Sequence, residues 1–293
     1  MNKSVDIKSA IGLHVYGEVW GQELSDLQEV KDWGFDSVDY NGFNNINSAL
    51  FKMSDEEYTK FFLTIKRNAE QAGVIVGQAH APWRVDDKTL EQREYMISLV
   101  KRSIEGAGIM NCKRMVVHPM MPYGWDDMSE PSHMEETYNA NKEFLLALLP
   151  HAKKYDVTIC IENMPSRSLS VAKLTDLYKL VEEINDEHIG LCLDTGHALI
   201  TEDSPAEMLS KCKKWVRALH IHDNHGTVDN HIWPFLGKID WIAFSEAYRG
   251  TNLILSSETE CSLRFPKEAK ILKTNAMKHL ATIFRCIAEG TFN

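Results

Sequence analysis

The chain has 293 residues, of which 44% are hydrophobic and 25% are charged, and its formal net charge is −10. This composition excludes an intrinsically disordered chain, and the length suffices for one large domain or two small ones. The negative charge disfavours general attraction to nucleic acids and anionic membranes. We expect no transmembrane helix or signal peptide, and the six scattered cysteines are typical of reduced thiols in a cytoplasmic protein.

Short apolar runs alternate with longer amphipathic stretches along the chain. The apolar runs predict strands at 10–15, 37–40, 74–79, 114–117, 157–161, 189–193, 216–219 and 252–257. The amphipathic stretches predict helices at 25–33, 54–73, 89–106, 132–155, 170–184, from 204 onward, 241–248 and 266–288. Capping boxes are expected at four of these helix starts, namely Ser25 with Gln28, Ser54 with Glu57, Ser132 with Glu135, and Ser204 with Glu207.

This alternation favours a parallel sheet, and eight strand–helix units favour a closed (β/α)8 TIM barrel over an open doubly wound sheet. We therefore expect one barrel domain over residues 1–293. The chain contains neither the glycine-rich dinucleotide motif nor a P-loop, so both of those nucleotide-binding interpretations lose their main support.

Residues of metal-ligand type gather where the predicted strands end. In a barrel these ends meet at one rim, where the chemistry takes place. An isolated histidine there is usually a hydrogen-bonded structural group, as His14 and His222 are on this interpretation, and Asp194 alone would suit a helix N-cap. Nine such residues at one rim instead predict one or more divalent metal ions, and they are His80, His118, Glu162, Asp194, His197, His220, Asp229, His231 and Glu258.

Four stretches around these residues are specific: 117–119, 161–164, 193–197 and 220–241. With them the chain resembles, over nearly its whole length, the xylose-isomerase-like TIM-barrel superfamily, which includes sugar phosphate isomerases, epimerases and endonuclease IV. In epimerase-like members, the resemblance implies, one divalent ion is held at the positions of Glu162, Asp194, His220 and Glu258.

For endonuclease IV the resemblance implies three zinc ions. Their ligands would be His80, His118 and Glu162 for the first, Glu162, Asp194, His220 and Glu258 for the second, and His197, Asp229 and His231 for the third. Two departures from the family pattern fall in loops at the rim. Met120 stands where a glycine often follows His-Pro, and residues 235–238 replace a usual Pro-Gly-x-Gly run, so the shape of the substrate site is expected to differ more than metal binding.

The favoured function is a metal-dependent sugar or sugar phosphate isomerase or epimerase. Moving a proton beside a carbonyl through an enediolate needs an acid, a base and a Lewis acid, and a Zn²⁺, Mn²⁺ or Mg²⁺ ion would serve as the last. Glu162 and Glu258 are the predicted acid–base pair. We expect substrate contacts from His80, from Trp83 against a sugar face (with Trp20 as a further candidate), and from Arg167 with a hydroxyl or phosphate.

Two other classes stay open. An endonuclease-IV-like apurinic/apyrimidinic endonuclease would use the full ligand set, but the loops expected above the site carry acidic residues, Asp86, Asp87, Asp126, Asp127 and Glu130. A surface that binds DNA should instead carry lysine and arginine, so nucleic acid is an improbable partner. A barrel that binds a sugar or metal without catalysis ranks third. One to three metal ions per chain and a homo-oligomer are compatible with the sequence.

Overall fold

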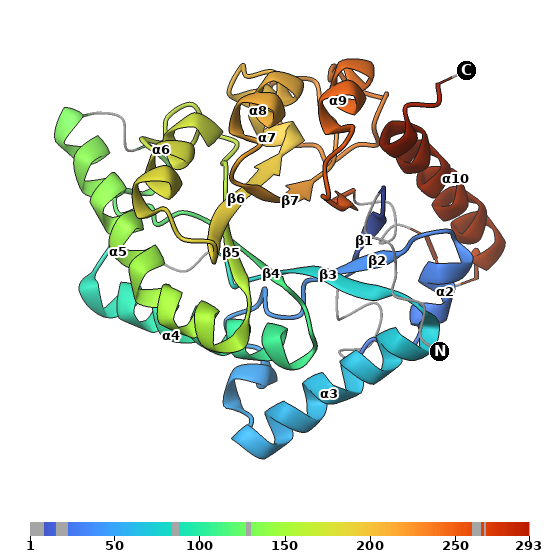
Figure 1. Ribbon diagram of the computed structural model, residues 1–293, viewed down its shortest axis with the longest axis horizontal. Helices are drawn as coiled ribbons and strands as arrows, with labels where there is room; N and C mark the ends of the chain where they lie inside the picture. The colour runs from blue at the N-terminus through green and yellow to red at the C-terminus, as the bar shows by residue number, and fades with distance from the viewer. Residues whose placement is uncertain are drawn as a thin grey trace.

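The computed structural model describes residues 9–15, 23–83, 88–126, 130–259, 265–266 and 268–292, and they form a ring of parallel strands with helices outside it (Figure 1). The strands are β1 (Ile11–Val15), β2 (Ser37–Tyr40), β3 (Ile75–His80), β4 (Arg114–Val117), β5 (Thr158–Glu162), β6 (Ile189–Asp194), β7 (Val216–His220) and β8 (Leu255–Ser257). The helices are α2 (Leu27–Asp32), α3 (Asp55–Ala72), α4 (Leu90–Ile109), α5 (Pro131–Tyr155), α6 (Leu174–Ile184), α7 (Thr195–Ile200), α8 (Pro205–Cys212), α9 (Trp241–Tyr248) and α10 (Lys270–Glu289). Two short 3₁₀ turns are η1 (Ala49–Lys52) and η2 (Gly124–Asp126).

The strands form one eight-stranded parallel sheet in the order β7-β6-β5-β4-β3-β2-β1-β8. The two ends of this sheet meet just beyond β7. There the Ile221 N–H donates to the Ser256 carbonyl at 2.8 Å, and the Glu258 N–H donates to the Ile221 carbonyl at 3.1 Å. These bonds close the sheet, which confirms the predicted (β/α)8 barrel.

Helix ends follow the local sequence where a capping residue is present. Ser54 caps α3 and forms the predicted reciprocal box with Glu57, and Gly73 ends the helix in the left-handed conformation at φ 67°. At α8 the Ser204 hydroxyl accepts a bond from the Glu207 N–H, which is one half of the predicted box. A box of Thr89 with Gln92 at α4 was not predicted.

Other helix starts differ from the prediction. Asp26 is the N-cap of α2 and makes no side-chain capping bond, so the predicted box of Ser25 with Gln28 does not form. Helix α5 starts at Pro131, which suits the first helical position, and the box expected at Ser132 is absent there. Helices α6 and α10 start at Leu174 and Lys270 rather than at 170 and 266, and the short helix α7 was not predicted at all.

A small apolar layer inside the barrel lies directly below the rim. It consists of one buried residue from each of four neighbouring strands, Val116, Cys160, Cys192 and Ala218. Side chains two residues apart on a strand share a face. Glu162, Asp194 and His220 each lie two residues beyond a member of this layer, so the barrel interior presents them at the rim, above an apolar floor.

A much larger apolar cluster packs the helices against the outside of the strands and includes Trp33, Trp215 and Trp241, as expected of packing residues. The described cysteines are free thiols, and Cys261 lies outside the described residues. None of the described helices is long and apolar enough to cross a membrane.

Candidate metal centre

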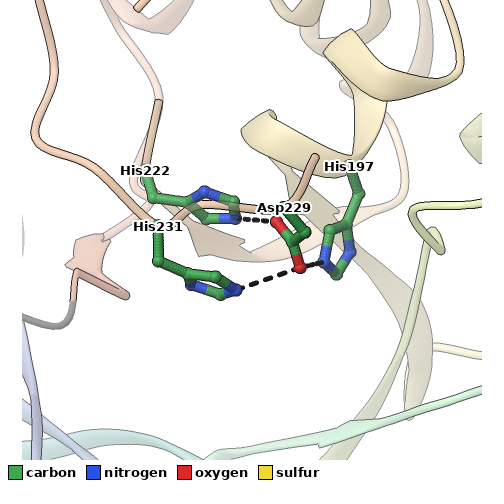
Figure 2. A group of neighbouring side chains, drawn as sticks. All are labelled: His197, His222, Asp229 and His231. Atoms are coloured by element: carbon green, nitrogen blue, oxygen red, sulfur yellow. Dashed lines mark hydrogen bonds and ion pairs between the residues drawn. The ribbon is translucent and has the colours of Figure 1, made fainter. Parts of the chain in front are cut away.

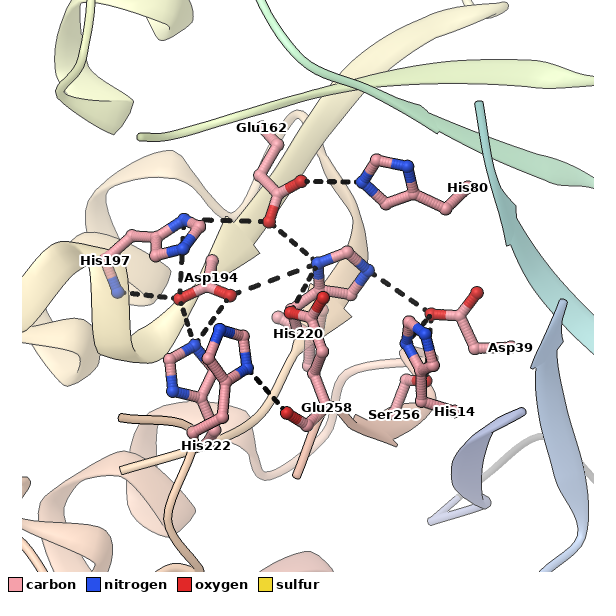
Figure 3. A network of polar contacts seen from close by, with 12 residues as sticks. His14, Asp39, His80, Glu162, Asp194, His197, His220, His222, Ser256 and Glu258 are labelled. Carbon is pink, nitrogen blue, oxygen red and sulfur yellow. Dashed lines mark hydrogen bonds and ion pairs between the residues drawn. The ribbon is translucent and has the colours of Figure 1, made fainter. Parts of the chain in front are cut away.

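Four ligand-type side chains from adjacent strand ends converge on one point, and we call Glu162, Asp194, His220 and Glu258 the inner group (Figure 3). His220 Nδ1 lies 2.7 Å from Glu162 Oε1, 3.1 Å from Glu258 Oε2 and 4.0 Å from Asp194 Oδ2. The side chains of the first three are fully buried, and that of Glu258 is 15% exposed. The inner group is thus a desolvated cluster of three carboxylates around one imidazole.

Two more histidines reach the same glutamate from the opposite side. Glu162 Oε2 lies 3.4 Å from His80 Nε2 and 3.3 Å from His118 Nε2. The rings of His80 and His118 meet edge to face, with their centroids 4.9 Å apart. Glu162 therefore stands between two sets of ligand atoms and could be shared by ions in both.

A second cluster lies beside the inner group, and we call His197, His222, Asp229 and His231 the outer group (Figure 2). Asp229 Oδ2 is 3.1 Å from the Nε2 atoms of both His197 and His231. His222 Nε2 lies 3.7 Å from Asp229 Oδ1 and 3.0 Å from the Asp194 carboxylate, so it touches both groups.

Backbone carbonyls fix the ring orientation of three of these histidines. The Nδ1 atoms of His80, His197 and His231 each lie 2.7 Å from a carbonyl oxygen, those of Ala81, Asn163 and Glu258 respectively. A carbonyl can only accept, so each Nδ1 carries a proton and each Nε2 points into its cluster, where it can bind a metal ion after giving up its own proton. This is the ring orientation that binds a metal, held by the kind of hydrogen bond that metal-ligating histidines usually make.

Asp194, Thr195 and Gly196 each have a separate structural role. Asp194 caps the short helix α7 by accepting the His197 N–H at 2.7 Å, so the N-cap alternative and membership of the inner group hold together. The Thr195 hydroxyl donates to the His222 carbonyl at 2.8 Å and fixes the chain beyond β7. Gly196 is required because a Cβ atom there would lie 2.0 Å from His222 Cε1.

The buried carboxylates stay ionised because histidines surround them. Burial opposes the charged form of Glu162, but His220 and the other histidines outweigh it and hold its pKa well below the ordinary value. Burial likewise opposes protonation of His197, but Asp194 and Asp229 raise its pKa to about 10. At His231, Asp229 overcomes burial in the same way and raises the pKa to about 10. Without a metal ion, protons on the histidines balance the negative charge of the carboxylates. Metal binding would release these protons.

The residues present fit a divalent ion. In each group the candidate ligand atoms lie within 4.8 Å of one another. Carboxylates with one imidazole, as in the inner group, suit Mn²⁺, Mg²⁺ or Zn²⁺, whereas the imidazole-rich outer group suits Zn²⁺. Within the described part of the chain, the buried atoms Asp229 Oδ1 and His222 Nδ1 make no hydrogen bond, and buried polar atoms in that state are uncommon.

A cavity of about 400 Å³ opens above the clusters. Trp83 and Trp125 contribute two indole walls, and Asn41 and Asn44 contribute amides. The cavity is lined by Asn41, Asn44, His80, Trp83, His118, Trp125, Glu162, Met164, Pro165, His197, Asp229, His231 and Glu258. It is of a size and polarity that suit a small polar molecule held directly over the candidate ligands.

Comparison with known proteins agrees with this geometry. Residues 27–279 match the family described as the xylose isomerase-like TIM barrel. The chain belongs to this family. An uncharacterized protein of Methanocaldococcus jannaschii is 28% identical over 222 residues, 72% of this chain and 73% of its own. A probable endonuclease 4 of Mycoplasma mobile is 22% identical over 250 residues, 78% of this chain and 82% of its own.

Solved xylose isomerase-like barrels share the fold at low sequence identity. A putative xylose isomerase from Rhodospirillum rubrum is 17% identical, covering 94% of this chain and 98% of that one, with a TM-score of 0.77. A D-psicose 3-epimerase is 18% identical, with coverage of 95% and 99% and a TM-score of 0.71. The IOLI protein with a bound zinc atom is 18% identical, with coverage of 97% and 99% and a TM-score of 0.70.

The structure brings all nine predicted ligand-type residues into the inner group, the outer group or the pair of histidines beside Glu162. His80 and Trp83 line the cavity, whereas Arg167 is not among its described lining residues. The Arg167 side chain instead donates to the Ile200 carbonyl at 2.8 Å and pairs with Glu202 at 2.8 Å. Trp20, Asp86, Asp87 and Asp127 lie outside the described residues.

The sequence analysis missed three features of the site. His222 was interpreted as an isolated structural histidine, but it joins the outer group. Trp125 and Asn41 line the cavity from loops that carried no recognised motif. The sequence did contain a signal for His222. It lies two residues after His220, so in extended backbone it is on the same face.

Proposed function

We propose that this chain is a metal-dependent isomerase or epimerase of a sugar or sugar phosphate, with Glu162 and Glu258 as the acid–base pair. The observation that carries the proposal is the placement of both glutamates in the inner group and in the lining of one cavity. A proton could leave one face of a bound sugar and return from the other. The named epimerase among the similar barrels supports the substrate class.

The inner group is the proposed primary metal site, with Glu162, Asp194, His220 and Glu258 as ligands. A divalent ion there would supply Lewis-acid stabilisation of the negative charge that develops on a carbonyl oxygen. His80 with His118, and the outer group, are proposed sites for further ions, which gives one to three per chain. The zinc-bearing IOLI barrel supports metal binding by this fold.

The chain's own residues supply the remaining chemistry. Burial opposes ionisation of Glu258, but His220 outweighs it and holds the pKa well below its ordinary value, as it does for Glu162. Both side chains therefore begin as carboxylates, the form that abstracts a proton. The Trp83 and Trp125 indoles would pack against the apolar face of a sugar ring, while His80 and Asn41 offer polar contacts to its hydroxyls.

Proton exchange in D₂O tests this function directly. A panel of ketoses and ketose phosphates should gain deuterium beside the carbonyl in the presence of the metal-loaded wild-type chain. Glu258→Gln keeps the side-chain shape but cannot act as a base, so it should lose the exchange by at least about a hundredfold while sugar still binds. Glu246→Gln on the exposed face of α9 is the matched control and should exchange at the wild-type rate.

Metal content must be measured on each variant, because Glu258 is also a proposed ligand. Exchange at the wild-type rate in Glu258→Gln would show that the assigned role is wrong. Absence of exchange with every sugar, from a wild-type chain that carries its metal, would remove the isomerase proposal itself.

One observation favours a second candidate, an endonuclease-IV-like cleavage of abasic DNA. All nine residues implied by the three-zinc arrangement come together, and a probable endonuclease 4 matches 78% of the chain. We rank it second because the net charge is −10 and Glu130, at a rim loop, is exposed and acidic. Cleavage of an abasic duplex by the zinc-loaded chain at physiological salt would reverse this order.

A further inference from the structure

Asp39 is a fully buried carboxylate on β2, across the barrel interior from the inner group. Its Oδ2 atom lies 3.3 Å from His220 Nε2, accepts a bond from Gln78 Nε2 at 2.7 Å, and lies 3.4 Å from Ser256 Oγ. Figure 3 shows it on the side of His220 that faces away from Glu162. A buried charge is costly unless it is paired, so this position calls for an explanation.

The two ring nitrogens of His220 face different partners. Nε2 faces Asp39, while Nδ1 faces Glu162 and Glu258 in the inner group. A metal ion in the inner group would take the lone pair of Nδ1. The proton that the ring keeps would then lie on Nε2, facing the Asp39 carboxylate, which can only accept.

His220 differs in this respect from the other histidines of the site. His80, His197 and His231 are oriented by backbone carbonyls and present Nε2. Of the described ring nitrogens that face away from a cluster, only that of His220 meets a carboxylate that lies outside both groups. A carboxylate partner makes an imidazole more basic than a carbonyl does, and partners of this type change metal affinity by about 10- to 100-fold.

We propose that Asp39 is the positioning residue of the inner group, which fixes the ring and tautomer of His220 and thereby sets the affinity of the site for its metal ion. The inference rests on the inner group being a metal site, as in the proposed function, but it does not depend on the substrate or the reaction. Asp39 would contact neither metal nor sugar. Its effect would pass entirely through the Nε2–H of His220.

The substitution Asp39→Asn separates this role from a general structural one. Asparagine has the same shape, and its amide oxygen can still face His220 and Gln78 while the charge is removed. Ser256→Ala is the matched control, because it removes a weaker contact to the same carboxylate and leaves the His220 pairing in place. Thermal unfolding without metal reports the structural cost of each substitution separately, since removing one partner of a buried ion pair can destabilise a fold.

Two measurements on the 293-residue chain test this inference. Binding of Mn²⁺ alone, followed through the electron paramagnetic resonance signal of the free ion, should weaken by about 10- to 100-fold in Asp39→Asn and by less than about threefold in Ser256→Ala. In the Zn²⁺-loaded chain, the Nε2–H proton resonance of His220, assigned by comparison with His220→Gln, should lie far downfield in the wild type, as expected for a bond to a carboxylate, and should move upfield in Asp39→Asn.

The outcomes are distinct. Equal Mn²⁺ affinity in the wild type and Asp39→Asn would overturn the inference and leave the proposed function standing. A wild-type chain that takes up no divalent ion would overturn both. Weaker binding with an unchanged His220 Nε2–H resonance would also overturn it, because the loss would then come from charge or from packing rather than from the imidazole.

Discussion

The inner and outer groups use the same residue types but are built on different parts of the barrel. The inner side chains come from the ends of four adjacent strands, β5 to β8, and are largely desolvated. Two outer residues, Asp229 and His231, lie on the loop between β7 and α9, and their side chains are 27% and 22% exposed. Strands hold the inner geometry rigidly, whereas the outer geometry depends on how that loop is anchored.

The anchor of the loop is a single buried carboxylate. Asp223 accepts hydrogen bonds from the backbone N–H groups of Asn224, Gly237, Lys238 and Ile239 and from the indole N–H of Trp241, at 2.8 to 3.2 Å. Gly237 is required there, because a Cβ atom would lie 2.2 Å from Asp223 Oδ1. The loop that carries the outer group is therefore folded around one side chain at its base.

The largest effect is expected where the two groups meet, at Asp194. Asp194→Ala should strip the ion from the inner group and abolish proton exchange, because it removes a ligand and leaves His222 Nε2 without its closest acceptor. Loss of the α7 cap should cost about 1 kcal/mol of unfolding free energy, so most of the fold survives. Elemental analysis for metal and thermal unfolding check both parts.

Asp203→Ala, three residues beyond the end of α7, is the control and should keep its metal. Unchanged metal content in Asp194→Ala would mean that Asp194 is not a ligand of the inner group. Asp194 would then be left as the cap of α7 and the acceptor for His222.

The residues of the inner group could be predicted from the sequence because each of them lies at, or just after, the end of an apolar strand. A parallel barrel places every strand end at one rim, so a carboxylate or histidine at the end of an apolar run is located as soon as the strand is recognised. Strands β2 and β4 were predicted to the residue, and so was α9. The same alternation that presents Glu162 and Asp194 also explains why the barrel below them is apolar.

The rim position of His197, Asp229 and His231 was predicted from the residues, but their grouping into one site came only from the family resemblance, which did not include His222. The five bonds to Asp223 come from residues up to 18 positions away, a pairing that no periodicity reveals. Arg167 is a different case, because spacing along the chain does not say where a side chain points. It was predicted to contact the substrate, and in the structure it donates to the Ile200 carbonyl and pairs with Glu202.

Weakening the Asp223 hydrogen bonds that hold the loop should reduce metal binding at the outer group and not at the inner group. Asp223→Asn replaces one acceptor oxygen with an amide that faces N–H donors, so the unfolding free energy should fall by about 2–3 kcal/mol. The outer group should lose its zinc affinity while the inner group keeps its own ion. Zinc stoichiometry and urea unfolding give the two readouts.

Asp240→Asn provides the control on the same loop. Asp240 caps α9 by accepting the N–H groups of Ile242 and Ala243, and asparagine caps helices nearly as well. Its cost should therefore stay below about 0.5 kcal/mol. Equal losses of inner and outer metal in Asp223→Asn would show that the loop supports the entire rim and that the two groups are one unit.

The smallest effect on inner-group metal and on proton exchange is expected at Gly196, which belongs to neither group and contacts His222 by packing. In Gly196→Ala the new Cβ would overlap the His222 ring, which must then shift away from Asp194 and from the outer group. Overpacking of this kind costs about 1–3 kcal/mol. Zinc binding at the outer group should weaken, while inner-group metal and proton exchange should change by less than about threefold.

Ala198→Gly, which weakens the same short helix by about 1 kcal/mol without touching His222, separates helix stability from ring placement. A Gly196→Ala chain that keeps outer zinc but loses proton exchange would place His222 with the inner group, as a partner of Asp194.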